Sequence, residues 1–228
     1  MVAIELDTEA LAWLAAHPRA LGVPGSAADE AVTEEAADRA EQVAPLTGWV
    51  NNAAVFRDAS VHTASGREIL DLVQTNLAPA VVGATTAVRR FLATGTGGAI
   101  VNVSSHQAQR AVPGCTPYVT AKAAIEGLTR ALAVEYGPRG VRVNAVALGS
   151  IATERYAAYL DGLGQDAAAQ VEEEMRRIHP LGRVGAAAEV ASVIAHLLSD
   201  DAAYVTGATV PVDGGRSVLA RDPEAHGI

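Results

Sequence analysis

Tyr118 and Lys122 are the residues of this sequence whose types and spacing most directly suggest chemistry. Residues four apart on a helix share one face and stack one turn apart. An ammonium held beside a phenol favours the tyrosinate, so it lowers a phenol pKa that is ordinarily about 10. We therefore predict that Tyr118 acts as a general acid and base near neutral pH. The alternative is an ordinary exposed helix pair, which stabilises a helix by roughly 0.2–0.5 kcal/mol.

The basic residues of the chain are almost all arginine. Of 17 Lys and Arg residues, Lys122 is the only lysine. Arginine is a permanently charged planar fork, whereas lysine is a compact charge on a flexible stem. A lone amine among guanidinium groups suggests a position where the two are not interchangeable. The alternative is a leftover surface lysine.

Apolar runs of strand length alternate with longer helical stretches, a pattern typical of a parallel sheet flanked by helices. We predict strands over residues 2–6, 20–25, 48–53, 99–104, 141–147 and 209–212. We predict helices over residues 9–16, 29–43, 66–93, 116–136, 165–178 and 187–199.

Polar residues follow three of these strands. They are Asn51 with Asn52, Ser104 with Ser105, and the segment 149–153. In open α/β sheets ligands bind beyond the carboxyl ends of the strands, so these groups should meet at one edge. There the Ser105 hydroxyl could orient a substrate carbonyl or alcohol. The alternative for Asn51 and Asn52 is that they chiefly tie neighbouring strands together.

Composition sets limits on the class of protein. With 228 residues, half of them hydrophobic, the chain can form one domain over 1–228 with a sizeable core. A net charge of -9 argues against a nucleic-acid surface. The opening segment lacks a basic leader, and no apolar run approaches the roughly 18 residues of a membrane span. The single Cys115 excludes an internal disulfide and a cysteine-rich metal site. We expect a cytoplasmic protein without membrane or nucleic-acid partners and without a metal.

Six motifs occur in a characteristic order. They are NNAA (51–54), TNL (75–77), IVNVSS (100–105), PGxxxYxxxK (113–122), RVNAVAxG (142–149) and VDGG (212–215). On these motifs the sequence resembles the short-chain dehydrogenase/reductase family from about residue 2 to 217. The resemblance implies a Rossmann-like, doubly wound parallel sheet with helices on both faces. It also implies an oxidoreductase that transfers a hydride between a nicotinamide cofactor and a secondary alcohol or ketone, assembled as a homodimer or homotetramer.

The resemblance assigns roles to individual positions. Tyr118 would exchange a proton with the substrate oxygen, and Lys122 would lower the tyrosine pKa and bind the nicotinamide ribose. Ser105 would bind the substrate oxygen, and Asn76 would hold a water that continues the proton relay. For Asn76 the alternative is a satisfied packing residue. The implied cofactor-binding set is completed by Asn52, Ala53, Gly149, Ile151, Thr153 and Glu5. The segment 150–181 would form a substrate lid, or simply a helical pair packed on the sheet.

One part of the family pattern is missing. The family begins with a strand and a glycine-rich turn, TGxxxGxG, whose N–H groups and following helix receive the cofactor pyrophosphate. No such turn precedes residue 2, and neither Gly95–Gly98 nor Gly214–Gly215 lies between a strand and a helix. Because that first strand lies in the middle of the family's sheet, we expect the fold to be missing or rearranged there. There are three alternatives: either residues 2–6 close the gap in the sheet, or another segment fills it, or the natural protein is longer than this sequence. A start codon assigned too late would explain every feature, while a natural truncation would weaken dinucleotide binding severely.

Three further positions concern the cofactor, and two of them depart from the family pattern. Glu5 aligns with the acidic residue that binds the adenosine ribose hydroxyls, which favours NAD over NADP. Ser26 stands where the family has an aspartate near the adenine, and Leu148 replaces the proline of the usual Pro-Gly pair. A second hypothesis of a different class is a cofactor-free binding or scaffold protein that keeps this fold. The missing glycine-rich loop favours it, and the intact serine, tyrosine and lysine argue against it.

Overall fold

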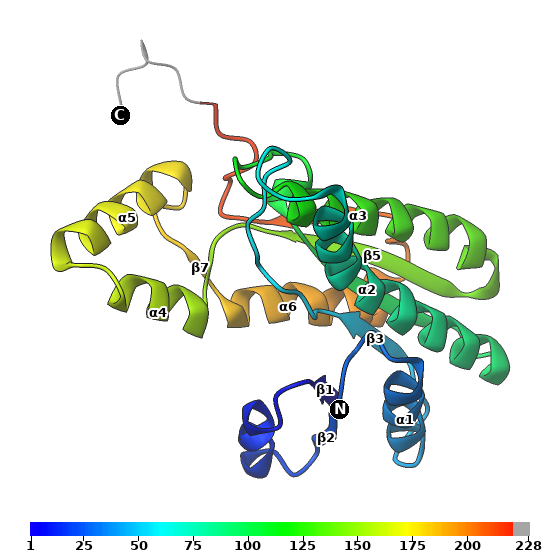
Figure 1. Ribbon diagram of the computed structural model, residues 1–228. Coiled ribbons are helices and arrows are strands. Elements are labelled where there is room, and N and C mark those ends of the chain that lie inside the picture. Colours follow the sequence, from blue (N-terminus) through cyan, green and yellow to red (C-terminus); the bar gives the residue numbers. More distant parts are fainter. Residues whose placement is uncertain (221–228) are drawn as a thin grey trace.

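The main sheet has four parallel strands with helices on both of its faces (Figure 1). We describe residues 1–220 from a computed structural model. The strand order is β3 (Gly48–Asn51), β4 (Gly98–Ser105), β5 (Val141–Leu148) and β8 (Thr209–Val212). Helices α2 (Gly66–Thr94) and α3 (Thr116–Tyr136) pack together on one face, and α6 (Ala187–Leu198) contacts β4 and β5 from the other. The expected doubly wound parallel sheet is confirmed.

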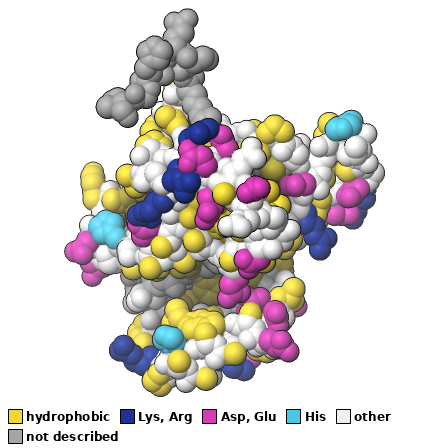
Figure 2. All heavy atoms as spheres, turned by 90° about the vertical axis from the view of Figure 1, so that its left-hand side faces the viewer, with side chains coloured by type: hydrophobic (Ala, Val, Ile, Leu, Met, Phe, Trp, Pro, Cys, Tyr) yellow, Lys and Arg dark blue, Asp and Glu magenta, His cyan; other side chains and the backbone are white. Residues whose placement is uncertain are grey.

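The first two strands are separate from this sheet. Strand β1 (Val2–Glu5) pairs in parallel with β2 (Leu21–Pro24), and no strand within residues 1–220 joins them to β3. The expected break in the sheet is therefore confirmed. Neither residues 2–6 nor another described segment closes it, so those two expectations are wrong. Figure 2 shows the surface hollowed between the lower part, which holds β1 and β2, and the body above it.

Helix α1 (Glu30–Glu41) joins the separate strands to the main body, because it packs against both β1 and α2. Arg90 of α2 forms ion pairs with Asp38 at 2.7 Å, with Glu41 at 3.0 Å and with Glu34. The hydroxyls of Thr33 and Thr86 are also hydrogen-bonded across this interface, at 2.9 Å and out of solvent.

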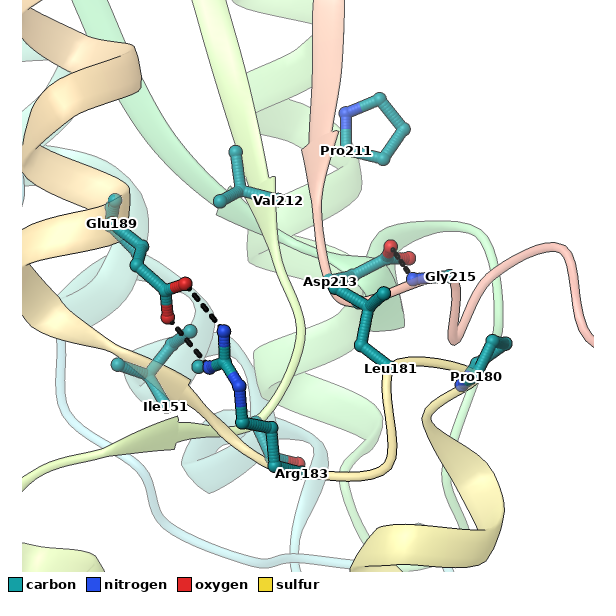
Figure 3. Close-up of a pocket in the computed structure, with 13 residues that line it drawn as sticks. Ile151, Pro180, Leu181, Arg183, Glu189, Pro211, Val212, Asp213 and Gly215 are labelled. Atoms are coloured by element: carbon teal, nitrogen blue, oxygen red, sulfur yellow. Dashed lines mark hydrogen bonds and ion pairs between the residues drawn. The ribbon is translucent and has the colours of Figure 1, made fainter.

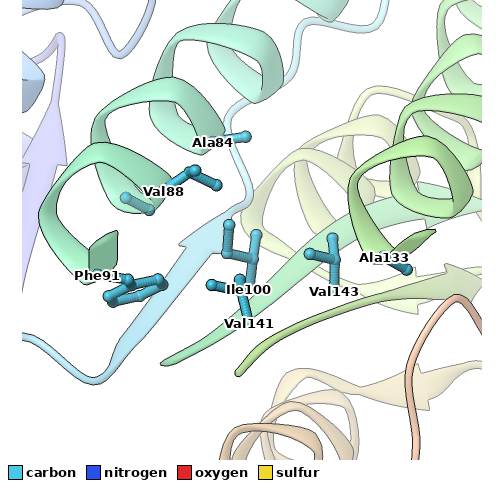
Figure 4. Packing of buried hydrophobic residues seen from close by; sticks show 8 residues of the cluster. Ala84, Val88, Phe91, Ile100, Ala133, Val141 and Val143 are labelled. Atoms are coloured by element: carbon cyan, nitrogen blue, oxygen red, sulfur yellow. The ribbon is translucent and has the colours of Figure 1, made fainter. Parts of the chain in front are cut away.

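The hydrophobic core lies between the sheet and its helices (Figure 4). Nearly all residues of β4 and β5 are buried, so side chains on both faces of these strands are covered. Runs rich in β-branched residues, such as AIVNVS and VRVNAVA, suit strands covered on both sides. Under α2 and α3, Phe91 packs against Ile100, Val141 and Val143. Beneath α6, a second cluster holds Val101, Val103, Val146, Leu197 and Ala202.

Most element boundaries agree with the sequence pattern. The helices over 116–136 and 165–178 and the strand over 209–212 are confirmed to the residue. Helix α2 begins where the Ser65 hydroxyl accepts from the Glu68 N–H, ends at Gly95 with a left-handed φ of 67°, and passes through Pro79. The expected α-helix over 9–16 is instead the 3₁₀ helix η1 (Glu9–Ala16), and the strand over 48–53 ends at Asn51.

The remaining elements lie on either side of β5 in the chain. They are β6 (Ile151–Ala152), α4 (Glu154–Asp161), α5 (Gln165–Ile178), β7 (Gly185–Ala186) and the 3₁₀ turns η2 (His106–Ala108), η3 (Gly137–Arg139) and η4 (Asp200–Ala202). Helices α4 and α5 project beyond the sheet, at the left of Figure 1. None of the helices within residues 1–220 is long and apolar enough to cross a membrane.

Candidate active site

The candidate site lies where β4 and β5 end, because their register places Ser105 beside Leu148 at the same edge. Ser105 is the last residue of β4, and its hydroxyl accepts a hydrogen bond from the Gln107 N–H at 3.1 Å. Tyr118 lies in the first turn of α3, with Lys122 one turn further on. The structure thus brings together the three residues that the sequence singled out.

Lys122 is buried beneath Tyr118, with 2% of its surface exposed. Its ammonium donates a hydrogen bond to the Val103 carbonyl at 2.8 Å and lies 5.5 Å from the centre of the Tyr118 ring. Burial disfavours the charged form and lowers the pKa of Lys122 to about 8. The alternative of a surface lysine is therefore wrong.

The pKa of Tyr118 departs from expectation. Burial raises it above the ordinary phenol value, while an interaction with the Ser105 side chain and the positive charge of Arg155 pull it down. The predicted lowering of the Tyr118 pKa is therefore wrong for this structure, because loss of solvent around the phenolate outweighs the favourable contacts.

Asn76 is buried in α2, with 3% of its surface exposed. Its side-chain oxygen accepts from the Val55 N–H at 2.8 Å, and its amide donates to the Leu72 carbonyl at 3.2 Å. Both ends of the side chain are engaged with backbone, so Asn76 fastens the loop after β3 to α2. This arrangement corresponds to the packing role considered above.

A chain of side-chain hydrogen bonds crosses the sheet beneath the site. The Asn51 amide donates to the Asn102 oxygen at 2.8 Å, and the Asn102 amide donates to the Thr129 hydroxyl at 2.9 Å. Asn51 thus ties strands together, which was the alternative for this residue. Asn52 and Ala53 lie in the exposed loop that follows, where a ligand can reach them.

The loop after β5 places the other expected cofactor residues at the same edge. The Gly149 N–H donates to the Val212 carbonyl at 3.0 Å, and a Cβ on Gly149 would lie 2.7 Å from the Asp213 Cα, so a side chain is not tolerated there. Ile151 pairs with Gly185 of β7. Thr153 caps α4, where its hydroxyl accepts from the Tyr156 N–H at 3.3 Å.

Two residues that the sequence did not reveal hold this loop from behind. His179 is 1% exposed; its Nδ1 lies 2.7 Å from the Met175 carbonyl and its Nε2 lies 3.3 Å from the Ser150 nitrogen. Because a carbonyl only accepts, Nδ1 carries the proton and Nε2 accepts from Ser150. Arg216 donates to the Ser150 hydroxyl at 2.6 Å. Neither residue belongs to a short motif, so only the fold could have found them.

His106 lies in the same buried region, behind Ser105. Burial, followed by the charge of Arg216, lowers the pKa of His106 to about 4, so its ring is neutral at physiological pH. Its Nδ1 is one of two buried side-chain atoms without a hydrogen-bond partner in residues 1–220; the other is Oε1 of Gln107.

A pocket of about 390 Å³ adjoins the loop after β5 (Figure 3). Arg183 and Glu189 form an ion pair at 2.7 Å beside it, and the Glu189 carboxylate also accepts from the Ala186 N–H at 2.7 Å. Ile151, Pro180 and Leu181 provide apolar walls, and Asp213 and Gly215 come from the segment after β8.

Glu5 is the last residue of β1, in the pair of strands that is separate from the main sheet. Its carboxylate accepts from the N–H groups of Leu6 at 2.8 Å and Asp7 at 3.2 Å. Within residues 1–220 no group of three His, Cys, Asp or Glu side chains could hold a metal ion.

The chain matches the family model described as Enoyl-(Acyl carrier protein) reductase over residues 3–217. It is 36% identical over 201 residues to "Inactive 2-(S)-hydroxypropyl-CoM dehydrogenase 2" of Xanthobacter autotrophicus, covering 88% of this chain and 86% of that protein. It is 44% identical over 166 residues to the 3-oxoacyl-acyl-carrier-protein reductase FabG of Pseudomonas aeruginosa, covering 73% of this chain and 64% of FabG.

Solved structures agree. Levodione reductase superposes with a TM-score of 0.85 at 31% identity, covering 96% of this chain and 88% of that chain. A gluconate 5-dehydrogenase from Burkholderia cenocepacia, in complex with NADP and tartrate, gives a TM-score of 0.83 at 28% identity, covering 96% and 86%. Together with the family match over residues 3–217, these similarities show that the chain belongs to the short-chain dehydrogenase/reductase family of nicotinamide-dependent oxidoreductases.

Proposed function

We propose that this protein interconverts a secondary alcohol and a ketone, with Tyr118 as the proton-transferring residue. The supporting observation is the arrangement of Tyr118 between Ser105, which interacts with its side chain, and the buried ammonium of Lys122, 5.5 Å from its ring. In reduction, the Tyr118 hydroxyl donates a proton to the substrate oxygen as that oxygen gains negative charge; in oxidation, the tyrosinate takes the proton back. Ser105 orients the substrate oxygen by hydrogen bonding.

The nicotinamide end of the cofactor has suitable partners in this chain. Ile151 and Thr153 would meet the carboxamide, Lys122 would bind the ribose hydroxyls, and Asn52, Ala53 and Gly149 would line the trough. When bound, the nicotinamide ring supplies or accepts the hydride. Asn76 positions the loop after β3 through its bond to Val55, and its amide has a second hydrogen with which, in this proposal, it holds the water of the proton relay.

The pyrophosphate end has no comparable partner within residues 1–220. Gly98 is the first residue of β4 and Ser105 is the last, so the cluster Gly95–Gly98 lies at the opposite end of this strand from Ser105. Gly214 and Gly215 follow β8 in a turn, and no helix begins behind them within residues 213–220, so they lack the strand–turn–helix geometry that receives a pyrophosphate. The residues present therefore fit the nicotinamide half of the cofactor and not its phosphates.

A second candidate function is cofactor-free binding on the same fold. Two observations favour it: the break between β1 and β3, and the similarity to a protein whose name describes an inactive dehydrogenase. Titration of the protein with NADH by calorimetry separates the two candidates. Saturable binding of NADH, together with oxidation of secondary alcohols by NAD⁺ to give NADH, supports the enzyme. Absence of binding at millimolar NADH would support the cofactor-free function instead.

For the cofactor we propose NAD, with NADP less favoured. Glu5 ends β1 with a carboxylate, which suits a ribose 2′-hydroxyl and repels a 2′-phosphate. The similar gluconate 5-dehydrogenase structure contains NADP, so both cofactors need to be tested. Parallel titrations with NADH and NADPH test the preference, and tighter binding of NADPH would contradict it.

We also propose that residues 1–228 form one domain and that the protein is cytoplasmic. We further propose that it assembles as a homodimer or homotetramer, and analytical ultracentrifugation would test this oligomeric state. Helices α2 and α3 offer exposed Leu70 and Val134 for such contacts. A monomer at micromolar concentration would contradict the assembly.

A further inference from the structure

A phenylalanine and an arginine lie directly beside Tyr118. The Phe56 ring, from the loop after β3, meets the Tyr118 ring edge to face with 4.9 Å between centroids. The guanidinium of Arg155, in the first turn of α4, lies 4.9 Å from the centre of the same Phe56 ring. Two segments on either side of the site thus meet over the tyrosine.

The charge of Arg155 is not neutralised by the protein. Elsewhere in the helical segment 154–189, Arg176 and Arg177 pair with Glu173 at 2.9 Å each, and Arg183 pairs with Glu189. Arg155 has no ion pair or hydrogen bond within residues 1–220, and its guanidinium lies over the Phe56 ring. The side chain is exposed, so its donors remain free for a ligand.

Two other cations of residues 1–220 lie close to Tyr118 or Phe56 in the chain, and both have other surroundings. Lys122 is buried and bonded to Val103, and Arg57 lines a separate hollow together with Asp58, Glu68 and Asp71. The chain as a whole carries a net charge of -9. The net negative charge would therefore repel an anionic substrate, while the Arg155 guanidinium would attract it locally, beside Tyr118. One guanidinium fork matches one carboxylate, with two parallel N–H···O bonds.

We propose that Arg155 binds a carboxylate of the substrate, so that the substrates are keto acids and the corresponding hydroxy acids. This inference rests on the proposed oxidoreductase function and narrows its substrate class. The Phe56 ring holds the guanidinium by a cation–π contact, so less side-chain freedom is lost when the acid binds. Because Tyr118 and Arg155 each lie 4.9 Å from the centre of the Phe56 ring, we expect several carbons between the carboxylate and the reacting carbonyl.

The test compares acids with esters of the same skeleton. Levulinate and its next two longer homologues are assayed with NADH beside their methyl esters, in wild type and Arg155→Met. We expect wild type to prefer one or more acids by about tenfold in kcat/KM, as a charge-assisted bidentate bond provides. In Arg155→Met the acid-to-ester ratio should fall by about the same factor, and Arg155→Lys should retain part of it.

Arg176→Met is the matched control, because Arg176 lies in the same segment and pairs only with Glu173 in the described chain. Its acid-to-ester ratio should stay within about twofold of wild type. An unchanged ratio in Arg155→Met, or a wild type that prefers the esters, would overturn the inference.

Calorimetric titration with the same acids and esters gives a second measurement that does not need turnover. The acid should bind wild type more tightly than its ester, and this difference should vanish in Arg155→Met. If the esters are turned over but no acid binds preferentially, the inference is wrong and the oxidoreductase function stands. If acids bind through Arg155 but nothing is turned over, the carboxylate site stands and the enzymatic function fails.

Discussion

At the scale of single residues, the only lysine of the chain occupies the most confined position in the site. Lys122 is 2% exposed, hydrogen-bonded to the Val103 carbonyl and placed against the Tyr118 ring. A guanidinium is larger, planar and permanently charged, so it can neither fit this space nor lose its proton there. This explains in physical terms why lysine is kept at 122 in a chain that otherwise uses arginine.

Lys122→Arg should therefore lower kcat by at least about a hundredfold, on the scale of lost acid–base catalysis. Steady-state kinetics on protein that binds the nicotinamide cofactor would measure kcat, and circular dichroism would confirm that the variant is folded. As a control, Arg130→Lys on the exposed surface of α3 should leave kcat within about twofold. Near-normal turnover by Lys122→Arg would show that the lone lysine has no special role.

The lowered pKa of Lys122 also predicts how stability depends on pH. Its value of about 8 lies below the ordinary 10.5, so between these values the unfolded chain binds more protons than the folded one. The free energy of unfolding contributed by this group therefore rises as the pH is raised through that window, by on the order of 3 kcal/mol. Below pH 8 the penalty for burying the charge is fully present.

Urea unfolding of wild type and Lys122→Met at several pH values between 7 and 10.5 would measure this difference. The other titratable side chains are present in both proteins, so the difference between the two pH profiles reports on residue 122. Parallel pH profiles for the two proteins would contradict the prediction.

At the scale of elements, the loop between β5 and α4 is held by residues far away in the chain. Leu148 stands where the family has proline, so the loop lacks that restraint. His179 instead accepts from the Ser150 N–H, and Arg216 donates to the Ser150 hydroxyl. These two bonds fix the backbone that leads to Ile151 and Thr153.

Substitution of His179 separates its two hydrogen bonds. In His179→Asn the amide can still donate to the Met175 carbonyl but no longer reaches Ser150, whereas in His179→Gln the side-chain oxygen can accept from Ser150. We expect His179→Asn to raise hydrogen exchange across residues 148–153 by about tenfold and to weaken NADH binding. The glutamine variant should restore much of both. Equal exchange in the two variants would show that the bond to Ser150 does not hold the loop.

At the scale of the whole molecule, two separate sheets are joined through one helix interface. Strands β1 and β2 have no backbone partner in the main sheet within residues 1–220, so α1 carries their connection to α2. Arg90 is central to it, because it is 24% exposed and pairs with three carboxylates. Two of these partners, Glu34 and Asp38, raise its pKa.

Arg90→Met should therefore loosen the first part of the chain more than the main sheet. We expect a loss of about 1–3 kcal/mol in local stability, since the three carboxylates would repel each other without the cation. Hydrogen exchange should increase in β1 and β2 while β4 and β5 stay protected. Arg89→Met is the control, because Arg89 forms only an exposed contact with Glu30 at 3.7 Å. If hydrogen exchange in β1 and β2 of Arg90→Met increased no more than in β4 and β5, the prediction would be wrong.

The sequence by itself determined the strands, the main helices and the neighbours in the site. Hydrophobic periodicity located α3, α5 and β8 to the residue, because buried strands and amphipathic helices leave regular patterns. The spacing of Tyr118 and Lys122 and the strand-end position of Ser105 likewise follow from local geometry, which sequence encodes directly.

Only the tertiary structure decided the surroundings of those residues. Whether Lys122 lowers the Tyr118 pKa depends on burial by segments far away in the sequence, and here burial raises it. Asn76 proved to be bonded to the backbone at both ends, and His179 and Arg216 meet Ser150 across 29 and 66 positions of the chain. Such contacts leave no periodic signal, because they arise when distant segments pack together. Sequence identifies the groups that do the chemistry, while packing sets their solvent exposure, and with it their pKa values and their partners.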